Sequence, residues 1–446
     1  MPAWRKSYSS MVIGALLVLA LMWLFSLPVK ARYPDLIVER AYFEDPAGLQ
    51  DIHSIQRQRF TPYEGPLFHG NDNRPLWLRL TLAPATSKDW VLMFQPNFLH
   101  YAQVWSQDAG GQWLQDVTGS RIAYSQRHVK SLVPAVAIAP SALTRTTVFI
   151  RVQTPTTPVH VRVLNRQNSM EFDALLSLVS GSFIGIGLIL AMFSALLYVN
   201  TRDLLWGADA LCNLAGVLVL SLQMGLVSRL ILPDSENLVN QLMLYANAGY
   251  LFVAAILHRL MFSMFALPRW AYLLNTIVLM AFPLLMALIF FGFGDKAMAI
   301  NNLLILLSSF WGVLLALKAR HRDRYLLRVF QFSYLGLVGY FIWWSIAVVL
   351  QRQTGNMVAL YPNLPASLFT MFMLLLILLR HTQLKAREAQ RVAIQKRDAE
   401  RDLLESQRRH EETQGFLGMV LHEVKNPLSS IRMIVANLEN TLPNAD

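Results

Sequence analysis

The order of apolar and polar residues along the chain predicts an exported protein. An apolar run over 11–27 follows Arg5 and Lys6 and precedes the small residue Ala31. This order of charged, apolar and small residues is typical of a secretory signal. We therefore predict that residues 1–31 are a signal peptide or, where they stay attached, a signal anchor. In either case the residues that follow are expected outside the membrane.

Residues 32–170 alternate apolar and polar side chains with a period of two. In the stretch 76–82, leucines occupy every second position, while Trp77, Arg79 and Thr81 occupy the others. This pattern predicts a strand with one buried face. Similar short runs occur at 36–43, 90–95, 101–107, 112–117, 134–138, 147–153 and 159–164. About eight short strands separated by turn residues predict an all-β sandwich, of jelly-roll type.

From residue 175 to residue 380 the chain becomes almost continuously apolar. The apolar stretches lie near 175–199, 204–230, 239–265, 270–292, 298–317, 328–350 and 358–379. Each is about long enough to cross a hydrocarbon core of about 30 Å as a helix. We therefore predict a seven-helix transmembrane bundle.

Basic residues in the short connections predict the orientation of the bundle. If residues 32–174 are outside, the inner connections contain eight Lys and Arg residues and the outer ones three. Lys and Arg stay on the cytoplasmic side of short connections. The β-domain is therefore expected on the periplasmic side and the C-terminal tail in the cytoplasm.

Two polar residues lie within the predicted second span. Asp209 and Asn213 are four residues apart and share one helical face. Ionisable groups are costly in lipid, so these side chains should point into the bundle. A packed polar contact between spans is favoured over an ion or ligand site, because the chain shows no internal symmetry of the transporter kind.

Residues 381–414 are rich in charge and lack Gly and Pro, which predicts a long helix continuing the seventh span. A heptad pattern places these residues on the seam: Ala389, Val392, Lys396, Ala399, Leu403, Ser406, His410, Thr413, Leu417, Val420 and Val424. Several seam positions are polar, which weakens pairing and permits alternative packing. A two-stranded coiled-coil linker is predicted, although a solvated single helix would have a similar sequence.

Composition narrows the class of protein. Of the 446 residues, 54% are hydrophobic and 15% are charged, with a net charge of +11. The charged fraction is well below the roughly 25% of soluble domains, so an ordinary soluble enzyme is excluded. The basic excess is spread along the chain, so no nucleic-acid partner is expected. The single cysteine, Cys212, excludes a disulfide framework and a cysteine-based zinc site, and no metal site is predicted.

The stretch 416–428 contains the candidate chemistry. In the heptad register His422 falls at an outward position, where its imidazole meets solvent. Histidine has an ordinary pKa of about 6.5, so much of it is neutral and nucleophilic at cytoplasmic pH and suited to accept a phosphoryl group. Glu423 can act as general base on the imidazole proton. Asn426, one turn further on, can position water for dephosphorylation.

The sequence His-Glu-Val-Lys-Asn-Pro-Leu from His422 to Leu428, after Phe416-Leu417, closely resembles the phosphoacceptor H-box of sensor histidine kinases. The resemblance implies that residues 415–446 are an incomplete dimerisation and phosphoacceptor domain. It also implies a homodimer through the tail helix and a response regulator as partner. The function expected is phosphoryl acceptance on His422 from ATP, followed by relay to an aspartate of that regulator.

The family also has an ATP-binding domain with Gly-rich motifs, and no such motif occurs here. This chain alone is therefore expected to bind no cofactor, and ATP and Mg are expected only with a complete kinase domain, encoded further on or supplied by another chain. The alternative function is a ligand-binding seven-transmembrane receptor or decoy that acts only through protein contacts.

The N-terminal part has a resemblance of its own. The segments Phe43-Glu44-Asp45-Pro46, Trp77-Leu78-Arg79 and Ile150-Arg151-Val152-Gln153 resemble the extracellular domain of bacterial seven-transmembrane receptors with diverse intracellular signalling modules. This resemblance implies that residues 32–170 are a periplasmic jelly-roll sensing domain of a protein of the bacterial inner membrane, with an unknown ligand of carbohydrate type. Trp77 could stack on a sugar ring, and Arg79, Asp72 and Asn73 could bond to it, although most tryptophans of a sandwich lie in its core.

Overall fold

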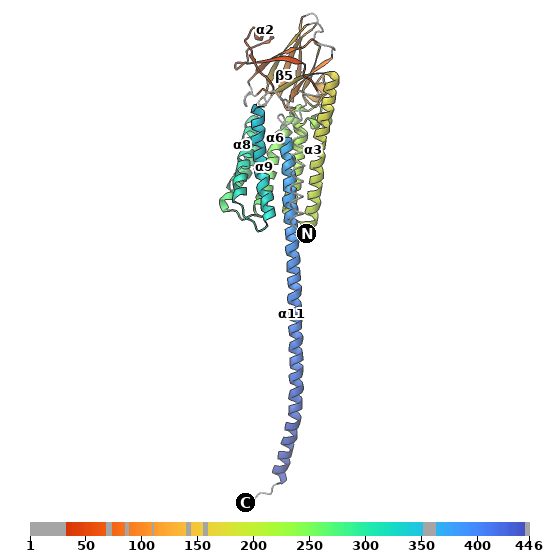
Figure 1. Ribbon diagram of the computed structural model, residues 1–446, viewed down its shortest axis with the longest axis vertical. Helices are drawn as coiled ribbons and strands as arrows, with labels where there is room; N and C mark the ends of the chain where they lie inside the picture. Colours follow the sequence, from red (N-terminus) through yellow and green to blue (C-terminus); the bar gives the residue numbers. More distant parts are fainter. Residues whose placement is uncertain are drawn as a thin grey trace. The chain divides into compact units, whose positions relative to one another are not determined.

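A computed structural model gives the architecture and describes residues 33–67, 74–84, 89–108, 111–139, 144–154, 159–350 and 363–441. The predicted signal segment 1–31 lies outside these ranges. The chain divides into two compact units, Met1–Leu378 and Leu379–Asp446. The first unit contains a β-domain and a group of apolar helices. The second contains the C-terminal part of the last helix, α11, from Leu379 onward, which is called the outer part of α11 below (Figure 1).

The β-domain is a sandwich of two antiparallel sheets, as predicted. The larger sheet has the strand order β2-β1-β3-β8-β5-β6, and the smaller has the order β7-β4-β9. The strands are β1 (Ile37–Glu44), β2 (Thr61–Pro62), β3 (Leu76–Leu82), β4 (Trp90–Gln95), β5 (Tyr101–Gln107), β6 (Trp113–Thr118), β7 (Ala135–Ile138), β8 (Thr146–Gln153) and β9 (His160–Asn165). The very short β2 was not predicted from the alternation.

The core of the sandwich lies between the two sheets. Leu78 and Leu80 of β3 are fully buried and belong to the same apolar cluster as Leu92 and Phe94 of β4. Complete burial of one such side chain contributes about 1.5–3 kcal/mol. The alternating leucines therefore form the inner face of β3, as their spacing predicted.

The other face of β3 is also covered, contrary to the prediction that only one face is buried. Trp77 is 0% exposed and stacks on Trp105, with ring centroids 5.0 Å apart. Ile55 and Phe60 belong to the same cluster. Ile55 comes from the one-turn helix α2 (Ile52–Ile55), whose N-terminus is capped by the Asp51 side chain. This unpredicted turn places apolar side chains over the outer face of the larger sheet.

Seven helices in the described part of the chain are long and apolar enough to cross a membrane, as predicted. The seven are α3 (Arg166–Thr201), α4 (Leu204–Gln223), α6 (Glu236–Phe262), α7 (Leu273–Phe290), α8 (Gly294–Lys318), α9 (Arg324–Leu350) and α11 (Asn363–Thr441). The short helix α5 (Leu226–Leu230) lies between α4 and α6 and is not one of them. Two 3₁₀ turns are η2 (Tyr124–Gln126) and η3 (Arg269–Tyr272). Many apolar side chains on the spans are exposed, which is typical of helices surrounded by lipid.

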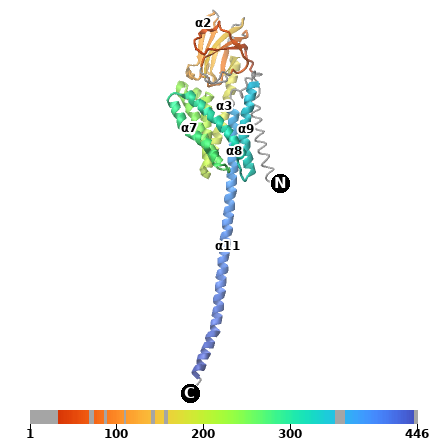
Figure 2. The ribbon, with the colours of Figure 1, turned by 90° about the vertical axis from the view of Figure 1, so that its left-hand side faces the viewer.

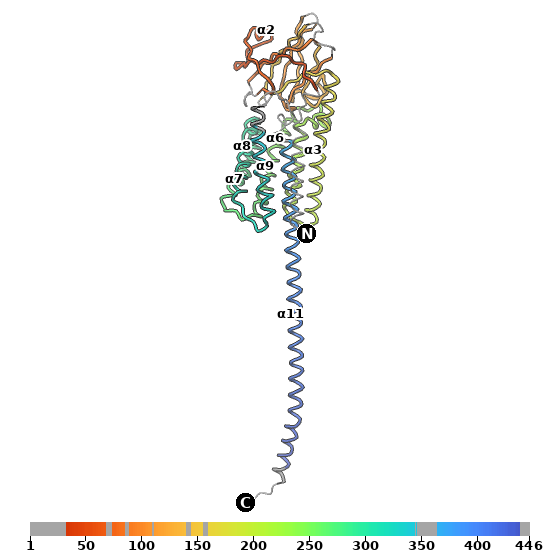
Figure 3. The backbone as a smooth tube through the Cα atoms, viewed as in Figure 1, coloured from red at the N-terminus to blue at the C-terminus, as the bar shows by residue number. Residues whose placement is uncertain are grey.

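The β-domain passes directly into the first span, as the backbone trace shows (Figure 3). Strand β9 ends at Asn165, whose side chain accepts a hydrogen bond from the Asn168 backbone and caps α3. Helix α3 therefore begins well before the apolar stretch predicted from residue 175. Its first turns pack on the sandwich, because Phe172 and Leu176 belong to a buried cluster with Val91 of β4.

Consecutive spans pack against one another, with contacts between α3 and α4, α4 and α6, α6 and α7, α7 and α8, and α8 and α9. Figure 2 shows α8 between α7 and α9. The polar pair predicted in the second span lies between two helices. Asp209 accepts hydrogen bonds from Ser194 of α3 at 2.6 Å and from Asn213 at 3.0 Å. The predicted packed contact between spans is confirmed.

The first turns of α11 complete the helical part of the first unit. Leu364 packs with Phe183 of α3 and Met224 at the end of α4. Ala366 packs with Tyr340 of α9. The membrane part of α11 is therefore held between the first, second and sixth spans.

Candidate functional site

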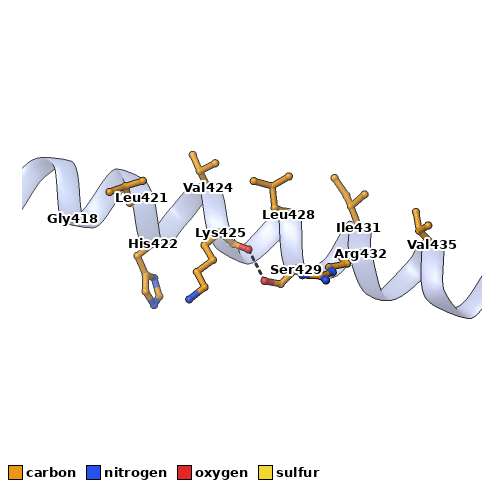
Figure 4. A pocket seen from close by; sticks show the side chains of 10 residues that line it. All are labelled: Gly418, Leu421, His422, Val424, Lys425, Leu428, Ser429, Ile431, Arg432 and Val435. Carbon is orange, nitrogen blue, oxygen red and sulfur yellow. Dashed lines mark hydrogen bonds between the residues drawn. The ribbon is translucent and has the colours of Figure 1, made fainter.

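His422 lies in the second unit, on the part of α11 where every described side chain is exposed. Figure 4 shows His422 and Lys425 on one side of the helix and Leu421, Val424 and Leu428 on the other. The imidazole is therefore accessible from solvent, as are the other described side chains on this part of the helix.

The residues predicted to act with His422 lie differently around it. The amide nitrogen of Asn426 is 3.5 Å from Nδ1 of His422, at the long limit for a hydrogen bond. Glu423 makes no hydrogen bond to His422 in the described structure, because successive helical residues project about 100° apart. The helix thus brings Asn426 beside the imidazole, whereas Glu423 needs a different side-chain rotamer to reach it.

Hydrogen bonds and one proline surround this part of the helix. The hydroxyl of Ser429 donates to the carbonyl of Lys425 at 2.8 Å, and that of Ser430 donates to the carbonyl of Asn426 at 3.0 Å. Pro427 lies inside the helix and has no N–H group, so the carbonyl of Glu423 loses its usual helical partner. The backbone next to His422 therefore has one hydrogen bond fewer than the backbone of an uninterrupted helix.

An apolar row runs along the side of α11 opposite His422 (Figure 4). It consists of Leu421, Val424, Leu428, Ile431 and Val435, which are 48–69% exposed. Their spacing alternates between three and four residues, the pattern that faces a partner helix. The heptad drawn from the sequence would place Pro427 on the seam after Val424, whereas the apolar row continues through Leu428 instead.

The sheet face predicted to bind ligand is partly closed. Trp77 is buried in the cluster described above, which favours the packing role over stacking on a sugar. Arg79 is half-buried, with its guanidinium 4.8 Å from the centre of the Phe60 ring. Asp72 and Asn73 lie outside the described residues. Of the predicted ligand residues that the structure describes, Arg79 alone keeps an accessible polar group on this face.

A carboxylate that the sequence analysis missed joins the β-domain to the helices. Asp173, near the start of α3, accepts hydrogen bonds from the Ser131 hydroxyl at 2.7 Å and from the Leu132 backbone N–H at 2.6 Å. Its other oxygen forms an ion pair with Arg229 of α5 at 3.1 Å. One side chain therefore connects a loop of the sandwich, the first span and the turn after the second span.

Further hydrogen bonds join two other loops of the sandwich to the helices. Asn97 donates to the carbonyl of Met224 at 3.0 Å, and Asn240 of α6 donates to the carbonyl of Ser120 at 3.1 Å. Gly225 has a φ of +74°, and a Cβ atom there would lie 3.1 Å from the Leu132 carbonyl oxygen. This glycine permits both the left-handed turn after α4 and the close approach of the sandwich.

His100 lies in a loop of the same region. Burial lowers its pKa, the positive charge of Arg121 lowers it further, and Asp295 at the start of α8 opposes both effects. Nδ1 of His100 is buried without a hydrogen-bond partner. Gly119, with a φ of +137°, places its backbone against the His100 carbonyl, where a side chain would collide. The histidine is therefore kept neutral near the ends of the spans.

Comparison with known proteins agrees with this architecture. No match was found among curated protein sequences. Residues 39–164 match the family described as 7TMR-DISM extracellular 2, and the match covers the sandwich from β1 to β9. Residues 39–164 are therefore similar to a 7TMR-DISM extracellular domain, and the seven apolar helices of a multi-pass membrane protein follow them.

Proposed function

We propose that this chain is the sensory and signal-transmitting part of a two-component sensor histidine kinase of the bacterial inner membrane. The observation that supports this best is the combination on α11 of an exposed His422, Asn426 one turn away, and an apolar row on the opposite side. A domain similar to an extracellular receptor domain and six apolar spans precede that helix, and its first part is the seventh span. We place residues 32–174 in the periplasm and the tail in the cytoplasm, following the distribution of basic residues.

In this proposal the chain presents an acceptor rather than a complete active site. A kinase domain encoded further on, or on another chain, holds ATP and Mg. The imidazole of His422 attacks the γ-phosphorus, a P–N bond forms, and the bond to ADP breaks. Glu423 receives the displaced imidazole proton after a rotamer change, and Asn426 positions water for the reverse hydrolysis. An aspartate of a response regulator then takes the phosphoryl group.

The same proposal requires a second copy of the chain. The exposed apolar row would be unfavourable in water for a helix that remained alone. Two copies of α11 that pair along the row bury these side chains and leave both His422 imidazoles outside. A change in the β-domain, carried through the spans, then alters the packing of the pair around the acceptor.

The test is phosphorylation of the full chain in lipid nanodiscs by an added ATP-binding domain of a histidine kinase and radiolabelled ATP. We expect an acid-labile label on the wild type and at least a hundredfold less on His422→Gln. His410→Gln is the matched control, because His410 is another exposed histidine of α11 bonded to the residue four positions on. This control should be labelled like the wild type.

Two outcomes would overturn the assignment. One is undiminished labelling of His422→Gln, which would place the phosphoryl group elsewhere. The other is an unlabelled wild type that still dimerises through α11, which favours the receptor that acts only through protein contacts. Membrane insertion of both variants, checked by protease protection, ensures that a lost label does not arise from misfolding.

A further inference from the structure

The outer face of the larger sheet carries two arginines on neighbouring strands. Arg79 of β3 is paired in register with Phe149 of β8, and Arg151 of β8 is paired with Trp77 of β3. The two arginines are therefore diagonal neighbours on one face, a spacing of about 7–8 Å that long side chains can bridge. Both are half-buried, so their charges are partly removed from water.

No carboxylate neutralises either arginine within the described ranges. Arg151 has one weak bond, to the side-chain oxygen of Gln103 at 3.4 Å, and its Nε is buried without a partner. Arg79 rests on the ring of Phe60. A half-buried guanidinium without an anionic partner is costly, because desolvation is not offset by an ion pair.

The carboxylates close to this face are engaged elsewhere. Glu39 of β1 accepts a hydrogen bond from Thr81 at 3.5 Å and pairs with Arg145 at 3.4 Å. Asp45 accepts the backbone N–H groups of Leu49 and Gln50 at 3.2 and 3.0 Å. Both carboxylates therefore have partners other than the two guanidinium groups.

Rigid aromatic packing fixes the position of the arginines. The stacked pair of Trp77 and Trp105 lies beside them in the sheet, and Trp113 meets Phe149 edge to face at 5.6 Å. The loop that carries Gly48 borders the site, since a Cβ atom on Gly48 would lie 3.9 Å from a terminal nitrogen of Arg151. The two guanidinium groups are thus carried by paired strands of the sheet and not by loops.

We propose that Arg79 and Arg151 form a binding site for a small ligand that bears an oxyanion, either a carboxylate or a phosphate. The planar fork of arginine matches both groups by paired hydrogen bonds. Gln103 supplies a polar contact next to Arg151. The inference deepens the proposed sensory role by naming the chemistry of the ligand, and it does not depend on His422.

The experiment is calorimetric titration of the full chain in nanodiscs at constant ionic strength. Glucuronate and glucose 6-phosphate are the probes with a carboxylate and a phosphate, uncharged glucose is their neutral counterpart, and succinate is a carboxylate without a sugar ring. We expect at least one anionic probe to bind and glucose not to bind under the same conditions. The order of affinity among the probes distinguishes a carboxylate from a phosphate ligand.

Three variants test whether anion binding depends on Arg79 and Arg151. Arg151→Gln and Arg79→Gln should each lower the affinity for the anionic probe by about tenfold or more, because each removes a charge-assisted hydrogen bond. Arg57→Gln, which removes an exposed charge just after α2, is the matched control and should bind like the wild type. Without ligand, Arg151→Gln should unfold at a higher temperature than the wild type, because an uncompensated charge is gone.

The proposal is overturned if none of the anionic probes binds, or if glucose binds as well as glucuronate. It is also overturned if Arg57→Gln weakens binding as much as Arg151→Gln, since the effect would then be general charge attraction. The thermal unfolding curves show whether each variant is folded. Labelling of His422 is a separate measurement, so the failure of one proposal leaves the other standing.

Discussion

The β-domain and the outer part of α11 differ in how far their apolar side chains are exposed. In the sandwich, Leu78 and Leu80 are 0% exposed, and Trp77 on the outer face of β3 is buried as well. On α11, Leu421 is 69% and Met433 70% exposed. The first region buries its apolar side chains within the chain, whereas the second leaves them exposed along one helix.

This difference indicates which contacts can stabilise each region. The sandwich is stabilised by burial within one chain, so its contacts determine its stability. The described side chains in the outer part of α11 are not buried in this way, so in the proposed dimer their packing depends on the partner helix. A helix of this kind is suited to signalling, because a small change at the spans can alter its pairing at little cost to the fold.

The largest expected effect comes from removing one core leucine. Leu78→Ala should destabilise the β-domain by about 2–5 kcal/mol, because it leaves a cavity between the sheets. Leu421→Ala is the matched change on α11 and should alter the stability of the β-domain by less than about 0.5 kcal/mol. Urea unfolding followed by tryptophan fluorescence measures both. Equal losses would mean that the two regions do not differ as described.

The next effect concerns the junction at Asp173. Asp173→Asn keeps an oxygen for the Leu132 N–H but removes the charge that attracts Arg229, and hydrogen bonds to charged groups contribute about 1.5–3 kcal/mol. Faster hydrogen exchange is expected in α5 and in residues 129–133. Asp234→Asn, an exposed carboxylate in the loop before α6, should leave exchange unchanged. Unchanged exchange in Asp173→Asn would show that the junction does not depend on this ion pair.

Local patterns predicted those features that depend on neighbours in sequence. The leucines of 76–82 gave the strand and its inner face, and seven apolar runs gave the spans because bilayer thickness sets their length. The nearness of Asn426 to His422 follows from helical spacing alone. Each of these features is determined within one or two turns of chain.

Features that depend on distant residues were not predictable in the same way. Trp77 was expected on a solvent face, but Ile55 of the one-turn helix α2 helps to cover it. Asp173 has partners 41 to 56 residues away in sequence, so no local pattern identifies them. The only signal was an acidic residue just before an apolar span, which by itself also fits a solvated helix end.

A smaller effect should appear as pH dependence at His100. Burial and Arg121 lower its pKa below the ordinary value of about 6.5, so the unfolded chain takes up the proton first as the pH falls. The stability that neutral His100 contributes is therefore fully present above about pH 6.5 and decreases as the pH falls from there toward the folded-state pKa. Thermal unfolding between pH 8 and pH 5 measures this decrease.

Substitution of His100 identifies the group responsible. His100→Gln should flatten the decrease in unfolding temperature between about pH 6.5 and pH 5, because the glutamine does not titrate. His53→Gln, at an exposed position of α2, should leave the wild-type curve unchanged. If the curve of His100→Gln coincides with that of the wild type, another group causes the decrease.

The smallest expected effect concerns the charged surface of α11. Arg408 and Glu412 form an ion pair at 3.3 Å, with 80% and 67% of their side chains exposed. Exposed pairs of this spacing contribute about 0.3–0.5 kcal/mol, so Arg408→Gln should barely change helicity by circular dichroism or dimerisation by analytical ultracentrifugation. Leu428→Ser, on the apolar row, should weaken the dimer measurably under the same conditions. If the two variants had equal effects, charges and not the apolar row would hold the helices together, and the contrast with the sandwich core would no longer explain how α11 is ordered.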